Sequence, residues 1–428
     1  MKIIFCRRIF KKIDIRGKIQ YNIDMEKIKT AIIGGGASGL FLATALHTTD
    51  KTVLFERNDR VGKKLSSTGN GQGNITNRLA SQTSYFSATP TGESLAKEVI
   101  CAADESRLNE YFQGLGVLLS TDDRDRVYPV SRQASSLTDA LRFAVAQKGI
   151  DLRLSSRVRD LQKAENGFVL TVESGEKTYQ IYAESVVLCA GGKAAKNFGT
   201  DGAAYALAKE VGHNVTNLYP SLVQLKTDVA HTKTLKGIRV NDGGLTAYLP
   251  DGKKVALNGD IIFTDYGVSG DAVFRISAYI ADKISAGVRL EIDFLPPFSK
   301  AEILQALQRK KAAFPDLPDG ELLFGIVNNQ VGRAVMKRAE GDLLQAANLV
   351  KAFPLTVTGS LGFDYAQVTK GGISMAEVTE NLESRFAPGL YFAGEILDVD
   401  GPCGGFNLQW AYSSAMRVAD ALNKKESI

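Results

Sequence analysis

Residues 28–39 read IKTAIIGGGASG, and an apolar stretch that continues to Leu46 follows them. The run before the glycines is short, apolar and rich in β-branched residues, which predicts a buried strand. The glycines then follow the spacing G-x-G-x-x-G. Gly34 permits a tight turn, Gly36 lets a pyrophosphate approach the backbone, and Gly39 lets a helix pack closely on the strand. This pattern predicts a dinucleotide-binding βα unit.

The residues around this fingerprint supply further groups for a nucleotide. Ala37 and Ser38 begin the helix, where free N–H groups and the helix dipole favour phosphate. A second apolar strand over 52–55 ends in Glu56, twenty residues beyond Gly36. Its carboxylate can accept hydrogen bonds from a ribose diol. No second fingerprint occurs in the sequence, so a separate domain for NAD(P)H is not expected.

A glycine-rich loop, STGNGQGNITN over 67–77, lies beyond the second strand. Such loops expose consecutive backbone N–H groups and form anion-binding nests. We expect the loop to close over the cofactor through Gly71, Gly73 and Asn74. The alternative interpretation is a flexible polar linker.

Charge and composition exclude several classes of protein. The net charge of +5 lies entirely in residues 1–24, which hold seven Lys or Arg and two Asp or Glu, so the remainder carries 45 of each sign. A generally basic, nucleic-acid-binding surface is therefore not expected. We predict that 1–24 is a leader that is disordered or not translated, with Met25 as the true start. The content of 44% hydrophobic and 23% charged residues is that of a globular protein.

The remaining composition predicts a cytoplasmic protein without a metal. Four cysteines stand far apart without a C-x-x-C pair, and three histidines show no ligand spacing. The uncharged run 30–49 contains three consecutive glycines, so strand, turn and helix explain it better than a membrane span. We expect no membrane partner.

Residues 388–411 read PGLYFAGEILDVDGPCGGFNLQWA. This stretch closely resembles the carboxy-terminal flavin signature of the bacterial BaiN-like NAD(P)/FAD-dependent oxidoreductases, which are related to aminoacetone oxidase. The resemblance spans about 28–420. Further blocks in the family order are 69–77, 126–129, 186–193, 263–272 and 368–378.

The resemblance implies an α/β protein with non-covalent FAD in a discontinuous Rossmann-type FAD-binding domain. The predicted segments of this domain are 25–210 and 364–428. Residues 211–363 are predicted to form an inserted domain, β-barrel-like over 211–298 and helical over 299–353. Ser299 and Glu302 form a capping-box pattern at the start of the helical part.

The resemblance also implies where the residues of the site lie. The helix over 406–422 would point its N-terminus at the pyrimidine edge of the flavin, and Glu395 would lie against the ribityl chain, with Asp398 or Asp400 sharing that role. The predicted cofactor-binding residues are Gly34, Gly36, Ala37, Ser38, Gly39, Glu56, Arg57, Lys64, Gly71, Gly73, Asn74, Ala190, Gly191, Gly394, Glu395, Asp400, Gly405, Phe406, Asn407 and Leu408.

No side chain stands out as a catalytic acid or base. The candidates are Cys403 and Lys370, near the expected flavin, and Tyr128, as part of a substrate wall. Two departures from the family pattern put an inherited substrate in doubt: Gln72-Gly73 replaces Arg-Cys, and Asp265 and Asp271 replace His and Pro.

We therefore predict an FAD-dependent oxidoreductase that transfers hydride between a small organic substrate and NAD(P)H or oxygen. The alternatives are an amine oxidase of the aminoacetone type, an FAD-containing RNA-modifying protein, or a non-catalytic flavin-binding scaffold. A small-molecule substrate without a nucleic-acid partner is the expected case, and the oligomeric state stays open.

Overall fold

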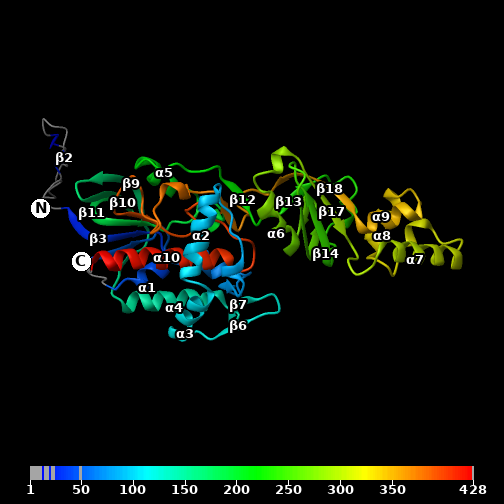
Figure 1. Cartoon of the computed structure of the whole chain (residues 1–428), viewed down its shortest axis with the longest axis horizontal. Coiled ribbons are helices and arrows are strands. Elements are labelled where there is room, and N and C mark those ends of the chain that lie inside the picture. The colour runs from blue at the N-terminus through cyan, green and yellow to red at the C-terminus, as the bar shows by residue number, and fades with distance from the viewer. Residues whose placement is uncertain (1–11, 14–18, 21–24, 48–50, 427–428) are drawn as a thin grey trace, which may run out of the picture.

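The computed structural model describes residues 12–13, 19–20, 25–47 and 51–426, so most of the predicted leader 1–24 lies outside the described residues. Figure 1 shows an elongated molecule with a large sheet and its helices at one end, a barrel in the middle and a small group of helices at the other end. Within the described ranges, no helix combines the length and apolar character needed to cross a membrane.

The large sheet has seven strands in the order β8-β4-β3-β11-β10-β9, and β20 pairs with β11. Strands β3, β4, β8 and β20 run parallel to their neighbours, whereas β9, β10 and β11 form an antiparallel meander. The strands are β3 (Glu26–Ile33), β4 (Thr52–Phe55), β8 (Asp151–Arg153), β9 (Ser156–Ala164), β10 (Gly167–Ser174), β11 (Lys177–Leu188) and β20 (Leu390–Phe392).

Strands β4 and β20 and the end of β3 are continuous buried runs because helices or strands cover both faces of the sheet there. All four residues of β4 are buried, and so are the last four of β3. The family block 186–193 begins at the end of β11, which starts at Lys177. The first part of β11 pairs with β10 and alternates between buried and exposed positions, as a strand with one solvated face does.

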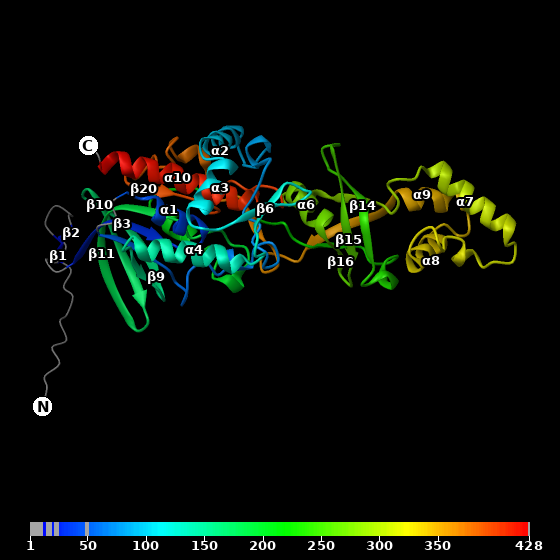
Figure 2. The ribbon, with the colours of Figure 1, turned by 90° about the horizontal axis from the view of Figure 1, so that it is seen from below.

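Helices cover the sheet, and α1 packs directly against α10 and α4. Figure 2 shows α10 lying along α1 although the two helices belong to opposite ends of the sequence. The helices of this part are α1 (Ala37–Ala45), α2 (Pro90–Ala102), α3 (Glu105–Gly114), α4 (Ala134–Gln147), α5 (Ala204–Glu210) and α10 (Phe406–Glu426).

Six strands close into the barrel in the order β13-β16-β15-β14-β17-β18. Strand β14 alternates between buried and less buried residues along most of its length, which places one face in the barrel core. Helix α6 (Asp271–Ile280) packs against β14 and β15. The barrel strands are β13 (Leu225–Thr227), β14 (Arg239–Tyr248), β15 (Lys254–Phe263), β16 (Gly267–Ser269), β17 (Val288–Asp293) and β18 (Phe353–Ser360).

The helical group lies between β17 and β18 in the sequence and consists of α7 (Lys300–Ala313), α8 (Asn329–Arg338) and α9 (Leu343–Lys351). The predicted capping box is present, because Ser299 accepts a hydrogen bond from the backbone of Glu302 and Glu302 accepts one from the backbone of Ser299. The helical pattern ends before Phe353, where the chain returns to the barrel as its last strand. One hydrophobic cluster joins the barrel and these helices, and a separate one serves the large sheet. The exact domain bounds stay a prediction.

Two small sheets lie outside the large sheet and the barrel. Strand β12 (Tyr219–Ser221) lies where the chain leaves the large sheet and its helices, here called the sheet-containing part, and β19 (Val368–Lys370) lies where the chain returns to it. The two strands pair with each other. Strands β5 (Thr76–Asn77), β7 (Arg126–Pro129) and β6 (Leu119–Thr121) form the second small sheet, in that order. A two-residue ladder of β1 (Lys12–Ile13) and β2 (Ile19–Gln20) stands apart.

A buried histidine ties the end of α5 to the carboxy-terminal segment. His213 Nδ1 lies 3.2 Å from Glu377 Oε2, and its Nε2 lies 2.6 Å from Ser384 Oγ. Burial lowers the pKa of His213 below its ordinary value of 6.5, although Glu377 opposes the shift. The folded protein therefore holds this ring in its neutral form.

His213 is expected to make stability depend on pH. A depressed folded pKa means that the unfolded chain binds the proton more readily, so this stabilisation is present above about pH 6.5 and is lost as the pH falls. His213→Gln should lower stability near pH 8 by about 1–3 kcal/mol, because buried partners lose a hydrogen bond. Its Tm should also fall less than the wild-type Tm between pH 8 and pH 5.5.

Thermal unfolding at the two pH values measures both effects, and His231→Gln, at an exposed position, is the control. The same loss of Tm on acidification in wild type and His213→Gln would contradict the assignment.

Candidate functional site

A cavity of about 1030 Å³ opens between the large sheet and the barrel. Its lining includes the glycine turn after β3, the end of β4, the glycine-rich loop, the segment after β11, the first turn of α10 and residues from β14, β15 and α6. Cavities for small molecules commonly measure about 300–1,000 Å³. This cavity therefore has room for a large ligand, or for a dinucleotide together with a second molecule.

The three fingerprint glycines serve different geometric needs. Gly34 has φ +109°, and a Cβ there would lie 2.6 Å from the carbonyl oxygen of Cys189. A Cβ on Gly39 would lie 1.9 Å from the carbonyl oxygen of Gly34. A Cβ on Gly36 would meet no protein atom within 4 Å, and Gly36 lines the cavity. The turn thus fits a pyrophosphate, since backbone borders open space at the start of a helix.

Glu56 holds this turn in place. Its Oε2 accepts a hydrogen bond from the backbone N–H of Gly35 at 2.8 Å, and its Oε1 accepts from the backbone and side chain of Asn58, each at 2.7 Å. Glu56 is buried yet contributes to the cavity wall, so its remaining lone pairs can accept from a ribose. The sequence predicted the ribose contact but not the support of the turn.

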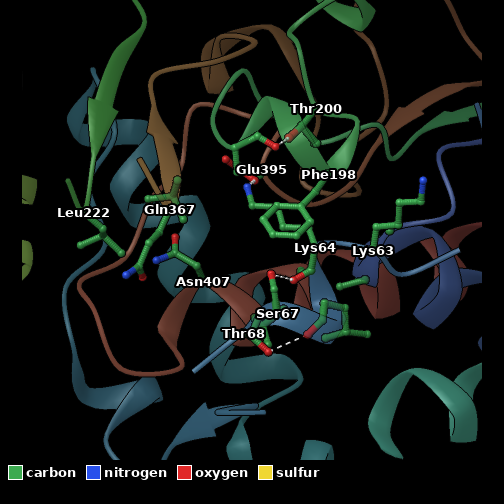
Figure 3. Close-up of a pocket in the computed structure, with 18 of the residues that line it drawn as sticks. Lys63, Lys64, Ser67, Thr68, Phe198, Thr200, Leu222, Gln367, Glu395 and Asn407 are labelled. Carbon is green, nitrogen blue, oxygen red and sulfur yellow. Dashed lines mark hydrogen bonds and ion pairs between the residues drawn. The ribbon is translucent and has the colours of Figure 1, made fainter. Parts of the chain in front are cut away.

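An ion pair joins the two halves of the sheet-containing part at the cavity wall. Lys64 Nζ lies 2.7 Å from Glu395 Oε2, and Glu395 Oε1 accepts from the backbone N–H of Thr369 at 2.8 Å. Thr369 Oγ1 in turn accepts from the backbone N–H groups of Lys193 and Ala194. Figure 3 shows Lys64 and Glu395 facing each other beside Phe198. Lys64 and Glu395 were predicted as cofactor residues, but their pairing was not.

The first turn of α10 faces the cavity through Asn407 and Leu408, and Gly404 and Gly405, which precede the helix, also line it. Asn407 closes the preceding loop, because its Oδ1 accepts from Gly401 N–H at 2.9 Å and its Nδ2 donates to Gly401 O at 2.8 Å. A Cβ on Gly405 would lie 2.3 Å from the carbonyl oxygen of Thr76, so this position has no room for a side chain. The helix terminus therefore presents unpaired N–H groups and a partial positive charge to the cavity.

Cys403 and Tyr128 both line the cavity, whereas Lys370 does not. The Lys370 ammonium lies over the ring of Phe86, 4.3 Å from its centroid. Burial raises the pKa of Cys403 to about 11, so the thiol stays protonated at neutral pH and lacks the activation that a nucleophile requires.

Tyr128 combines a buried side chain with a hydroxyl group that is available for hydrogen bonding. Only 5% of the residue is exposed, and its hydroxyl has no hydrogen-bond partner among the described residues. The Arg132 guanidinium lies over its ring, 4.2 Å from the centroid, and that of Arg126 lies 5.9 Å away. Burial raises the pKa of Tyr128, so the phenol is protonated at neutral pH. A buried phenol that borders a cavity can donate to a bound molecule.

The barrel and the β6–β7 segment contribute charged pairs that sequence reasoning missed. Arg124 Nη1 lies 3.1 Å from Asp271 Oδ2, and Arg126 Nη2 lies 2.8 Å from Asp122 Oδ2. Asp271, one of the two residues that depart from the family pattern, thus lies in the cavity wall. Asp265, the other departure, is exposed, pairs with Lys236 and does not line the cavity. The family blocks 126–129 and 263–272 were the sequence signals for this wall.

The cavity brings together most of the predicted cofactor residues but not all of them. Asp400 is 1% exposed, accepts from Ser221 Oγ at 3.3 Å and, through burial, has a pKa raised to about 7. Figure 3 shows Gln367 and Asn407 on another side of the cavity near Leu222. The predicted residues outside the lining are Gly39, Gly71, Gly73, Gly394, Asp400 and Phe406, and those within it are Gly34, Gly36, Ala37, Ser38, Glu56, Arg57, Lys64, Asn74, Ala190, Gly191, Glu395, Gly405, Asn407 and Leu408.

Comparison with known proteins gives matches over most of the chain. The model of a family described as HI0933-like protein Rossmann domain matches residues 28–421. A 3-dehydro-bile acid delta(4,6)-reductase of Clostridium scindens is 34% identical over 409 residues, or 90% of this chain and 97% of the relative. A ribosomal RNA dihydrouridine synthase of Escherichia coli is 27% identical over 414 residues, or 93% of this chain and 98% of that protein.

Solved structures agree on the fold. A 3-ketosteroid delta1-dehydrogenase from Sterolibacterium denitrificans, in complex with 1,4-androstadiene-3,17-dione, has a TM-score of 0.51 at 13% identity and covers 94% of this chain and 100% of that chain. At this identity the likeness shows the fold alone. The matches confirm the predicted fold class and the family resemblance predicted from the glycine fingerprint and 388–411.

Gly36→Val tests the assignment of the glycine turn. The new side chain points into open cavity rather than into protein, so the fold should survive while FAD is excluded from the turn. We expect purified protein with an unchanged circular dichroism spectrum and little or no bound flavin, measured by absorbance at 450 nm per mole of protein.

Gly114→Val is the matched control, because a Cβ there also meets no atom within 4 Å but lies outside the cavity lining. Full FAD occupancy in Gly36→Val would overturn the assignment.

Proposed function

The chain belongs to the HI0933-like family of FAD-dependent oxidoreductases, and from that premise we propose that it reduces a carbon–carbon double bond conjugated to a carbonyl group, with NAD(P)H as the source of hydride. The names of the two relatives support this reaction class. A delta(4,6)-reductase acting on a 3-dehydro-bile acid and a synthase of dihydrouridine both add hydrogen across such a bond. A bile acid and an RNA are also both anions at neutral pH.

The residues of the cavity wall fit bound FAD in both size and chemistry. We propose that Gly36, Ala37 and Ser38 bind the pyrophosphate, that Glu56 accepts from the ribose, and that the start of α10 lies at the flavin. FAD supplies a centre that accepts hydride from NAD(P)H and passes it to the substrate. We propose that the other predicted residues of the lining also contact FAD. The predicted residues outside the lining would support the residues that contact it, and they are Gly39, Gly71, Gly73, Gly394, Asp400 and Phe406.

The observation that carries the proposed reaction is the hydroxyl of Tyr128, which belongs to a largely buried residue, borders the cavity and has no hydrogen-bond partner among the described residues. Hydride addition at the β-carbon of a conjugated carbonyl compound leaves an enolate, and a proton must then reach the α-carbon. We propose that Tyr128 donates this proton and recovers it from water. Its raised pKa keeps the phenol protonated at neutral pH, and the protonated thiol of Cys403 also lines the cavity.

The positive end of α10 favours negative charge that develops beside it. Such a terminus stabilises an anion by about 0.3–2 kcal/mol. No second dinucleotide fingerprint exists in the sequence, so we propose that NAD(P)H enters the same cavity before the substrate does. The volume of the cavity is consistent with alternate occupation by two such molecules beside FAD.

Anaerobic half-reactions test the function. NADPH or NADH should bleach the bound flavin, and a conjugated ketone should restore its colour, whereas the saturated ketone should not. A panel of cyclohex-2-enone, a 4-en-3-oxo steroid acid, uridine and a uridine-containing RNA separates the possible substrates. Restoration by RNA but not by any small molecule would instead support the RNA-modifying alternative.

The function is wrong if neither nicotinamide nucleotide bleaches the flavin. Bleaching by aminoacetone with release of peroxide in air would then support the amine oxidase alternative, and bleaching by no donor would support a flavin-binding scaffold.

Tyr128→Phe tests the proton donor. General acid catalysis contributes about 10²–10⁴-fold in rate, so reoxidation of the reduced enzyme by a conjugated ketone should slow by at least about 100-fold. Reduction by NADPH should keep its rate, because that step needs no proton from Tyr128. Stopped-flow absorbance measures the two steps separately.

Tyr365→Phe is the control, since Tyr365 also lines the cavity but is 61% exposed. Equal slowing of both steps in Tyr128→Phe would indicate that Tyr128 only shapes the flavin site.

A further inference from the structure

We propose that Arg132 forms an anion-binding subsite at the edge of the cavity. The substrate that the enzyme reduces would carry a carboxylate or phosphate group that binds there. The inference rests on the proposed function, because the anion must belong to the molecule that is reduced. It adds a charge requirement that a conjugated carbonyl group alone does not impose.

The charges of the cavity single out Arg132. Eight Lys and Arg side chains line the cavity. Seven of them pair with a carboxylate, and Arg132 has no carboxylate within salt-bridge distance among the described residues. The paired cations are Arg57, Lys63, Lys64, Arg124, Arg126, Arg157 and Arg239. Two exposed lining carboxylates, Asp123 and Asp364, likewise lack an ion pair, and neither reaches Arg132.

The stacking of Arg132 leaves its hydrogen-bonding edge free. The guanidinium lies over the Tyr128 ring at 4.2 Å from the centroid, and no acceptor among the described residues takes its N–H groups. A guanidinium directs its five N–H groups outward in its own plane, so a ring against one face does not block them. This edge matches the two oxygens of a carboxylate or phosphate.

Hydrogen bonds hold the backbone of Arg132 in a turn. Its φ is +51°, a left-handed conformation that non-glycine residues adopt rarely. The Arg132 N–H donates to Pro129 O at 2.8 Å, which closes a turn after β7, and the Ala134 N–H donates to Gly71 O at 2.8 Å. These bonds fix the residue between β7 and the glycine-rich loop.

The subsite lies next to the proposed proton donor, because the same Tyr128 ring carries the guanidinium on its face and the hydroxyl at its end. An anion bound to Arg132 would therefore place the rest of the substrate near the Tyr128 hydroxyl. Arg132 thus selects and orients the substrate without taking part in the proton transfer.

Ligand binding to the oxidised holoenzyme tests the subsite without any turnover. The probes are two pairs: 3-oxo-5β-cholan-24-oic acid with its methyl ester, and uridine 5′-monophosphate with uridine. Perturbation of the flavin absorbance gives Kd for each. In the wild type we expect the anion of at least one pair to bind more tightly than its uncharged partner, and the responding pair identifies carboxylate or phosphate as the group.

Arg132→Gln should weaken binding of that anion by about 10- to 100-fold, as loss of a charged hydrogen-bond partner does, and leave the uncharged partner unchanged. Arg132→Lys should restore part of the loss. Arg142→Gln is the matched control, because Arg142 also stacks on an aromatic ring, that of Phe143 at 4.6 Å, but lies outside the cavity lining.

Three results would overturn the subsite. They are equal binding of anion and uncharged partner in the wild type, equal weakening of both by Arg132→Gln, and loss of bound FAD in Arg132→Gln, which would assign the arginine to the cofactor. Failure of NAD(P)H to bleach the flavin would refute the proposed function and leave these binding results as they stand.

Discussion

The contact between Gly39 and the carbonyl oxygen of Gly34 is the constraint on which the rest of the structure depends. A Cβ on Gly39 would lie 1.9 Å from that oxygen, so α1 can pack this closely on the end of β3 only because the side chain is absent. α10 and α4 pack on α1 in turn. The open space beside Gly36 is a consequence of the same turn. One small-residue contact thus sets both the packing of the helices and the floor of the cavity.

The sheet-containing part is completed by a segment that returns after the barrel and the helical group. Strand β20 pairs with β11, and α10 packs along α1, so both ends of the sequence share one hydrophobic cluster. Loop-closure entropy grows only slowly with loop length, so a folded insertion does not prevent this pairing. The ion pair of Lys64 with Glu395, 331 residues apart, and the hydrogen bonds of Thr369 hold the segments together at the cavity.

Pairing of charges gives the cavity a defined shape before any ligand enters. Most lining cations have an acidic neighbour, and Glu56 uses both carboxylate oxygens on backbone or amide donors. Side chains fixed in this way lose little further entropy on binding. The Tyr128 hydroxyl and the edge of the Arg132 guanidinium are exceptions among the described residues, which is why we propose the first for proton transfer and the second for substrate selection.

The sequence by itself determined the local features whose causes are local. The strand and glycine turn at 28–39, the Ser299 capping box and the apolar strand 52–55 all follow from residue type and spacing. The resemblance of 388–411 added the cofactor and the family. Tertiary structure alone decided which distant side chains meet. It pairs Lys64 with Glu395, keeps Asp400 out of the cavity wall and returns the chain at Phe353 to the barrel. It also leaves the Tyr128 hydroxyl without a hydrogen-bond partner among the described residues. Burial and pairing depend on elements remote in sequence, so no local pattern contains them.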